Sequence, residues 1–269
     1  MKAMKQLFLL SSLLLLVSSC ISINNGSTVV SFSGKDFEGA PSKTVITEHF
    51  TSLHNSGSLP VVYRMGDTYE VKVEGDESMF VNAKLEVVKD ELTIGLEPGT
   101  YKDLWLRVVV TSPYISSVWQ SGSGKIDCSS LTGQRELTLW VSGSGSISAD
   151  TVICQNLTTN VSGSGHLTVG YVACAEESAS VSGSGMVKMH EAAVANDMKM
   201  LISGSGSAQC NHLDVLSTLE ARVTGSGNVK VNGQAEKVKA IVQGSGSIGG
   251  DLEYNHIEKE KLGSGNIRL

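Results

Sequence analysis

Cys20 is the residue of this 269-residue chain whose chemistry is clearest from its neighbours. Two lysines precede an apolar run from Leu7 to Val17, a pattern typical of a secretory signal and too short to span a membrane. The run ends in Val17-Ser18-Ser19-Cys20, where small residues lead into a thiol that can accept a lipid. We expect a lipoprotein signal peptide at residues 1–19 and lipid attachment at Cys20. An ordinary signal peptide with an incidental cysteine is the alternative.

Residues 20–27 are predicted to form a short, lipidated tether before the folded part of the chain. Two or three acyl chains would hold such a protein stably in a membrane. We therefore expect a lipid-anchored protein of the bacterial cell envelope, most simply in the outer membrane. The tether contains no acidic residue that would direct export to the cell surface, so the surface and the periplasmic face both stay open.

The chemistry of the remaining residues depends on a repeat that organises the chain beyond residue 120. Ser-Gly-Ser-Gly, or its Gly-Ser-Gly core, recurs at intervals of 19 to 21 residues, which indicates a solenoid or a similar array. The first glycines of the eight copies are Gly122, Gly143, Gly163, Gly183, Gly204, Gly225, Gly244 and Gly263. Apolar residues lie at even offsets from this glycine and polar residues mostly at odd offsets, with Glu177 as the misfit. This two-residue period predicts strands with one buried face.

These patterns predict an all-β chain. We expect a parallel β-solenoid of about eight coils over residues 121–269, preceded over residues 28–120 by a strand-rich N-terminal region that continues or caps it. A transmembrane barrel is the main rival, because 20 residues could also form a hairpin of two strands. Such barrels need aromatic girdles, and residues 121–269 contain only Trp140, Tyr171 and Tyr254.

The repeats and several upstream segments resemble the bacterial putative auto-transporter adhesin, head GIN domain family. The upstream segments include His49-Phe50, Gly66-Asp67, Leu92-Thr93-Ile94 and Val110-Thr111-Ser112-Pro113, and the resemblance covers about residues 28–269. It implies a secreted or lipid-anchored protein with a β-solenoid-like structure and an adhesin-like role. It implies no catalytic residues.

The serine between the two glycines is present in every copy and is expected to face solvent. Its hydroxyls would form a column that presents donors and acceptors at the coil spacing. The candidate binding face consists of Ser123, Ser144, Ser164, Ser184, Ser205, Ser226 and Ser245. Two interpretations stay open: a small residue that fits a tight corner, or a repetitive surface that binds a glycan, another surface or another solenoid.

The acidic residues and histidines do not form a catalytic or metal site. Asp150 and Asp251 are the only aspartates of the repeats that share a position, and they lie five coils apart, about 24 Å. The histidines at 166, 190, 212 and 256 occupy four different positions. We therefore expect no enzyme, no metal and no cofactor. The net charge of −6 also argues against a nucleic-acid-binding protein.

Two cysteines are expected to be neighbours. Cys154 and Cys174 share a position on adjacent coils and should stack roughly 5 Å apart, as a disulfide or as two stacked thiols. Cys128 and Cys210 also share a position, but four coils separate them and exclude a bond between them.

The sequence therefore predicts a non-catalytic cell-envelope lipoprotein that acts as an adhesin or surface-binding solenoid. Its expected partners are the membrane, through the lipid, a glycan or surface ligand, and a second copy of the chain. The alternative is a structural or self-associating scaffold in the periplasm, because the last coil leaves an uncapped edge. A polysaccharide-active β-helix enzyme ranks third.

Overall fold

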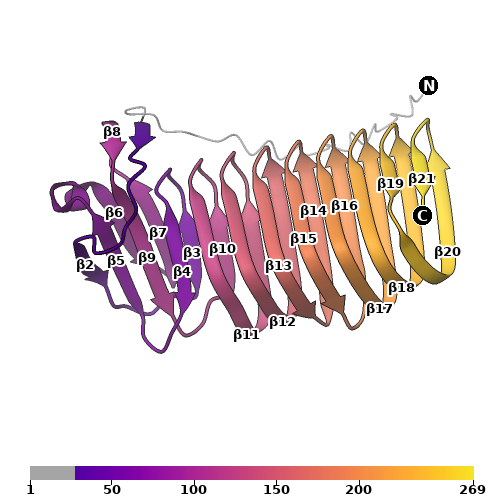
Figure 1. Cartoon of the computed structure of the whole chain (residues 1–269), viewed down its shortest axis with the longest axis horizontal. Helices are drawn as coiled ribbons and strands as arrows, with labels where there is room; N and C mark the ends of the chain where they lie inside the picture. Colours follow the sequence, from indigo (N-terminus) through magenta and orange to yellow (C-terminus); the bar gives the residue numbers. More distant parts are fainter. Residues whose placement is uncertain (1–27) are drawn as a thin grey trace, which may run out of the picture.

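Strands stacked side by side along one axis account for about 71% of residues 28–269, which are the residues that the structure, a computed structural model, describes (Figure 1). The predicted signal peptide, Cys20 and the tether lie outside the described residues. Among residues 28–269, no helix has the length and apolar character needed to cross a bilayer.

The N-terminal strands form a cap of mixed parallel and antiparallel pairs around one short 3₁₀ helix. These elements are β1 (Val29–Phe32), β2 (Ser42–Ile46), β3 (Ser52–Asn55), β4 (Val61–Met65), β5 (Glu70–Gly75), η1 (Glu77–Asn82), β6 (Ala83–Val88), β7 (Glu91–Leu96), β8 (Thr100–Leu104) and β9 (Leu106–Ser112). In the cap, β5 pairs antiparallel with β2 and β9, and β6 pairs antiparallel with β7.

All strands from β10 onward pair in parallel with strands of the neighbouring coils. They are β10 (Ser117–Gln120), β11 (Lys125–Val141), β12 (Ser146–Gly163), β13 (His166–Cys174), β14 (Glu176–Gly183), β15 (Met186–Val194), β16 (Met198–Gly204), β17 (Ser207–Gly225), β18 (Asn228–Gly244), β19 (Ser247–Gly249), β20 (Leu252–Leu262) and β21 (Asn266–Arg268). β20 and β21 of the last described coil pair with the coil before them. The predicted parallel β-solenoid is confirmed, with about eight turns.

The stacking of parallel strands also extends upstream of residue 121. β3 pairs in parallel with β10, and β4 pairs in parallel with β11, so β3 and β4 build a further coil. The turn between them contains Ser56-Gly57-Ser58, with Leu59 in place of the second glycine. β7 and β9 then pair in parallel with β3 and β4 on the other side, which joins this coil to the cap.

The Gly-Ser-Gly corners need glycine because successive coils approach one another closely there. Gly183 has a φ of +119°, and a Cβ on it would lie 2.6 Å from the carbonyl oxygen of Gly163 in the preceding coil. A Cβ on Gly185 would lie 2.5 Å from the carbonyl oxygen of Gly165 and would also clash with Val161. Both distances are far below van der Waals contact, so the two glycines meet a steric requirement of the corner.

The core is a set of columns, each formed by the residues at one position on successive coils. The column two residues before the first glycine runs Val141, Val161, Val181, Ile202, Val223 and Val242, and these residues are buried. Glu177 occupies a core position between Leu157 and Met198 and is 2% exposed. Thr159 donates a hydrogen bond of 2.9 Å to its Oε1, while Oε2 has no partner among the described residues. Burial raises the pKa of Glu177 to about 8.

The last described coil carries charge in two of these core columns. Lys259 pairs with Ala240 and Lys261 pairs with Val242, so both lysines occupy positions that are buried and apolar in earlier coils. Lysines on an edge strand, above all at inward-facing positions, disfavour the addition of another strand. β20 is therefore poorly suited to pair with a strand of a second copy. Such end-to-end packing is what an uncapped edge would allow.

Candidate functional site

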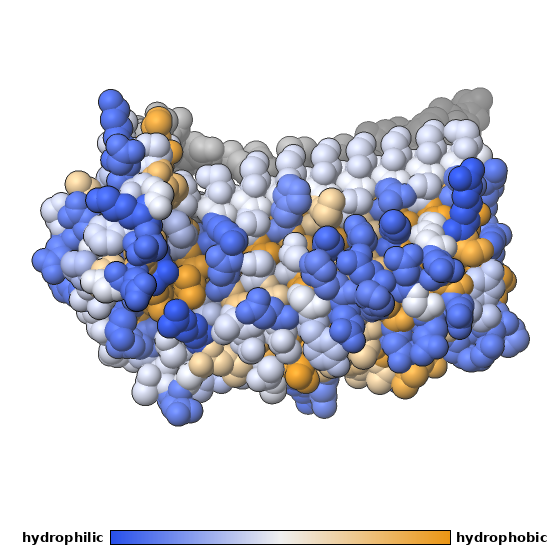
Figure 2. Space-filling view, viewed as in Figure 1, coloured by the Kyte–Doolittle hydropathy of each residue, from blue (hydrophilic) through white to orange (hydrophobic). Residues whose placement is uncertain are grey.

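The serines of the Gly-Ser-Gly corners lie at the surface, as their odd offset predicts. Each of the seven candidate serines, and Ser264 in the last copy, is exposed. The small residues of the corners form a pale band along the upper rim of the molecule in Figure 2. One hydrogen bond joins two neighbours in this column, 3.1 Å between Ser245 Oγ and Ser264 Oγ. The corner column therefore offers hydroxyls in a row but no concave or aromatic surface.

A second outward surface lies on the strand segments that lead into the corners, and we call it the pre-turn face. It consists of three columns, at five, three and one residues before the first glycine. The first column is Ser52, Ser117, Thr138, Thr158, Ser178, Lys199, Glu220, Lys239 and Glu258. The middle column is His54, Trp119, Trp140, Asn160, Ser180, Leu201, Arg222, Ile241 and Glu260. The third column is Ser56, Ser121, Ser142, Ser162, Ser182, Ser203, Thr224, Gln243 and Leu262.

Three aromatic rings stack in the middle column. The ring centroids of His54 and Trp119 are 4.2 Å apart with an interplanar angle of 9°, and those of Trp119 and Trp140 are 5.4 Å apart at 22°. Because the strands are in register, residues 65 positions apart in the sequence become direct neighbours. We call these three rings the aromatic stack.

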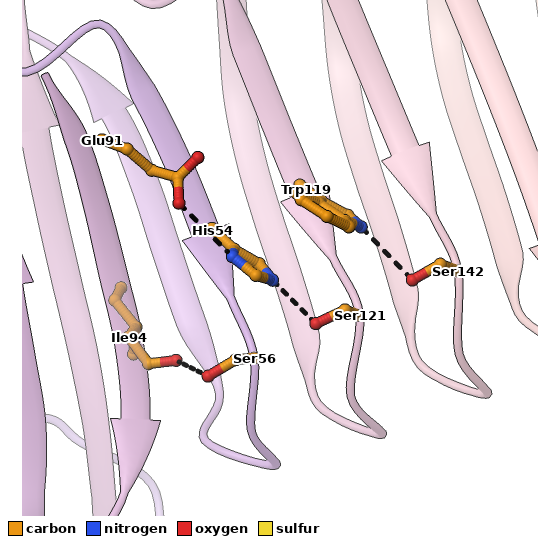
Figure 3. A network of polar contacts seen from close by, with 7 residues as sticks. All are labelled: His54, Ser56, Glu91, Ile94, Trp119, Ser121 and Ser142. Atoms are coloured by element: carbon orange, nitrogen blue, oxygen red, sulfur yellow. Dashed lines mark hydrogen bonds and ion pairs between the residues drawn. The ribbon is translucent and has the colours of Figure 1, made fainter. Parts of the chain in front are cut away.

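Hydrogen bonds to the third column hold the aromatic stack in place (Figure 3). His54 Nε2 lies 2.7 Å from Ser121 Oγ, and the Trp119 Nε1–H donates to Ser142 Oγ at 3.3 Å. Glu91 on β7 lies 3.6 Å from His54 Nδ1. Burial lowers the pKa of His54 below its usual value, although the nearby Glu91 carboxylate acts in the opposite direction. His54 is therefore predominantly neutral at pH 7.

Trp140 is the exposed end of the aromatic stack. Its side chain is 40% exposed, and no hydrogen-bond partner of its indole N–H is found within residues 28–269. One ring face packs against Trp119, while the next residue in the column on the other side is the smaller Asn160. The stack therefore ends in a partly exposed indole with one free N–H donor.

The pre-turn face changes character after the coil that contains Ser180. The five coils from β3 to β14 carry only serine, threonine, asparagine and the aromatic stack on this face, and we call them the uncharged half. The four coils from β16 to β20, which we call the charged half, carry six charged side chains. These are Lys199, Glu220, Arg222, Lys239, Glu258 and Glu260.

The sequence carries only part of the signal for the aromatic stack. Trp119 and Trp140 are 21 residues apart and both lie three residues before the first glycine of a repeat. His54 lies three residues before Gly57, which becomes informative only when Ser56-Gly57-Ser58 is recognised as a degenerate copy of the motif.

The candidate chemical residues are placed as their spacing indicated. Asp150 and Asp251 share an outward column, with Gly170, His190 and two asparagines between them. Within residues 28–269, no group of three or more His, Cys, Asp or Glu side chains is arranged to hold a metal ion. Asp150 and Asp251 are therefore too far apart to act together on one bond.

The four cysteines within residues 28–269 are all free thiols in the structure. Cys154 and Cys174 follow directly on the paired residues Ile153 and Ala173 of adjacent coils, and the disulfide or stack between them stays a prediction. Burial raises the pKa of Cys154 to about 11 and that of Cys174 to about 12. These thiols are protonated at neutral pH and are poor nucleophiles.

Comparison with known families gives this arrangement a context. The model of the putative auto-transporter adhesin, head GIN domain family matches residues 49–218. This chain belongs to that family. The match includes the aromatic stack, the whole uncharged half and the start of the charged half. The family is one of adhesin-like proteins of the bacterial surface or envelope. None of the curated proteins matches the chain.

Solved structures share the fold of this GIN-family chain. A putative adhesin from Parabacteroides distasonis has a TM-score of 0.74 and 22% identity, covering 90% of this chain and 99% of that one. A putative adhesin from Parabacteroides merdae has a TM-score of 0.68 and 18% identity, covering 91% and 99%. A putative lipid binding protein from Parabacteroides distasonis has a TM-score of 0.70 and 19% identity, covering 86% and 96%. At these identities the likeness concerns the fold alone.

Proposed function

We propose that this chain is a non-catalytic, lipid-anchored adhesin of the bacterial cell envelope that binds an external surface through its pre-turn face. The observation that carries the proposal is the uncharged half, where an exposed tryptophan stands among hydroxyl and amide side chains on a rigid parallel sheet. Exposed aromatic side chains surrounded by polar residues are typical of binding surfaces. The adhesin-like character of the family supports the same function.

Neither the aspartates that share a column nor the thiols of the repeats support a catalytic role. The two aspartates that share a column are five coils apart, and the thiols are buried and protonated. The periplasmic scaffold is also disfavoured in its end-to-end form, because Lys259 and Lys261 place charge in the core columns of the last coil. Binding through the pre-turn face needs neither a catalytic site nor an edge strand that pairs with another copy.

The first experiment locates the chain and tests adhesion in the same cells. Intact cells that produce the full chain are treated with protease, beside cells that produce the Cys20→Ala variant, and their attachment to coated surfaces is measured. We expect cleavage on intact cells, and we expect both attachment and membrane association to be lost in the variant. Protection until the outer membrane is opened would overturn the adhesin function and favour a periplasmic scaffold.

A further inference from the structure

We propose that the uncharged half binds a neutral glycan, with one sugar ring packed against the exposed part of the Trp140 ring and its hydroxyls bonded to the side chains around Asn160 and Ser180. This inference rests on the proposed adhesive function and names its ligand class and its place on the pre-turn face. It also moves the binding site away from the corner serines, which offer hydroxyls without an aromatic surface.

Trp140 offers a ligand a partly exposed aromatic ring. Trp140 ends the aromatic stack and is 40% exposed, which is unusual for a side chain with so much apolar area. Aromatic faces carry partial negative charge and attract the weakly positive edges of neighbouring groups, and the C–H face of a pyranose ring presents such edges. The free indole N–H adds one donor beside this surface.

The ring of Trp140 is held rigidly by its neighbours. Trp140 packs on Trp119, which packs on His54, and hydrogen bonds to Ser121 and Ser142 anchor the two inner rings. A ligand that stacks on the outer face therefore meets a surface that is already ordered. Such preorganisation lowers the entropic cost of binding.

A surface of small polar side chains lies beside Trp140, and we call it the floor. Two coils of small polar side chains follow Trp140 on the pre-turn face, and no side-chain hydrogen bond engages them within the described residues. These side chains are Thr158, Asn160, Ser162, Ser178, Ser180 and Ser182. Hydroxyl and amide groups both donate and accept hydrogen bonds, as the hydroxyls of a sugar do. The floor therefore matches the polar edge of the glycan while Trp140 matches its apolar face.

The floor is short and carries no charged side chain. Leu201 closes it three coils from Trp140, about 14 Å away at the usual strand spacing. Beyond Leu201 begins a shallow hollow of about 320 Å³ that is lined by Lys199, Glu220 and Arg222 of the charged half, so we place the end of the floor at Leu201. Between Trp140 and Leu201 the three columns of the pre-turn face contain no charged side chain. An anionic glycan would find no cation there, so the face suits a neutral chain of a few sugars.

The test uses isothermal titration of the purified chain with four neutral oligosaccharides, namely cellohexaose, maltohexaose, laminarihexaose and mannohexaose, and with anionic hexagalacturonate. We expect saturable binding of at least one neutral probe and weaker or no binding of hexagalacturonate. Trp140→Ala should weaken binding about tenfold or more, the size expected for the loss of one aromatic stacking contact.

Ser180→Arg blocks the floor without altering the aromatic stack, so it keeps the test valid if Trp140→Ala does not fold. The matched control is Ser184→Arg, the same substitution on the corner column four residues later. Ser180→Arg should abolish binding, whereas Ser184→Arg should leave it unchanged. Unfolding curves of all three variants show whether they are folded.

Three results would overturn the inference: no binding of any of the four neutral probes, binding of hexagalacturonate as tight as that of the best neutral probe, or binding that Ser180→Arg leaves unchanged. The cell assay separates this failure from failure of the proposed function. Attachment of cells that no neutral probe inhibits would retain the adhesin and reject the glycan site. Binding of a neutral probe to the purified chain without attachment of cells would retain the site and reject the adhesin.

Discussion

The uncharged and charged halves of the pre-turn face share one backbone and differ almost only in their outward side chains. Both halves are parallel strands that lead into Gly-Ser-Gly corners, and both cover the same apolar columns. Trp140, Asn160 and Ser180 occupy in one half the column that Leu201 and Arg222 occupy in the other. The comparison shows that a solenoid can change the chemistry of its surface from coil to coil while the path of its backbone stays the same.

The largest expected difference between the halves is in how stability depends on pH, and it comes from the core beneath them. Glu177 lies in a core column under the uncharged half, where the charged half has Met198 and Leu219. Its carboxyl pKa is raised to about 8 from 4.5, so the folded chain holds the proton more tightly than the unfolded chain. The stability from this proton is fully present below pH 4.5 and is lost as the pH rises through 8, a change of several kcal/mol.

Urea unfolding between pH 4 and pH 9 measures this loss. Glu177→Gln should flatten the profile over that range, while the control Glu176→Gln, at an exposed neighbouring position, should retain it. A pH profile that is the same with and without the Glu177 carboxyl would mean that the group is ionised in the folded chain.

Substitution of the corner glycines tests the backbone geometry that the two halves share. Gly185→Ala places a methyl group against the backbone of the preceding coil and should destabilise the chain by about 1–3 kcal/mol. Gly227→Ala in the charged half should cost a similar amount, because its Cβ would meet the equivalent carbonyl at the same 2.5 Å. Ser184→Ala is the control with no expected loss. Urea midpoints that differ widely between the two glycine variants would show that the halves are not built alike.

The aromatic stack tests what holds the uncharged half in its arrangement. Trp119→Ala removes both ring contacts and the hydrogen bond to Ser142, and should cost about 1–2 kcal/mol. Trp140→Ala removes one ring contact from an exposed position and should cost less. Thermal unfolding, followed by circular dichroism, ranks the two variants. The reverse order would place the main anchor of the stack at its exposed end.

Substitutions in the charged half are expected to change the free energy of unfolding least. Arg222 and Glu220 form an ion pair of 3.1 Å with side chains 38% and 24% exposed. Arg222→Gln should change the free energy of unfolding by less than about 1 kcal/mol, as is usual for surface pairs. It should also leave the binding of neutral oligosaccharides unchanged, measured by the same titration. A loss of binding in this variant would extend the site into the charged half.

Much of the fold follows from local features of the sequence. The two-residue alternation places Val181 and Val187 inside, and the spacing of the glycines sets the register of the coils. Glu177 stands out in the sequence as a misfit and is indeed buried. The limits lie where the repeat is imperfect. Ser56-Gly57-Ser58 lacks the second glycine, so the coil of β3 and β4 is not evident without the pairing of the strands.

The sequence by itself determined the all-β solenoid, its corner glycines and the exposure of the corner serines, because these depend on spacing within and between neighbouring coils. Only the tertiary structure decided that His54 joins Trp119 and Trp140, since the chain between β3 and β10 first forms six strands and a short 3₁₀ helix. It also showed that Trp140 ends this stack beside two coils of small polar residues. Contacts across such a separation depend on how the cap folds back, and no short-range pattern encodes that.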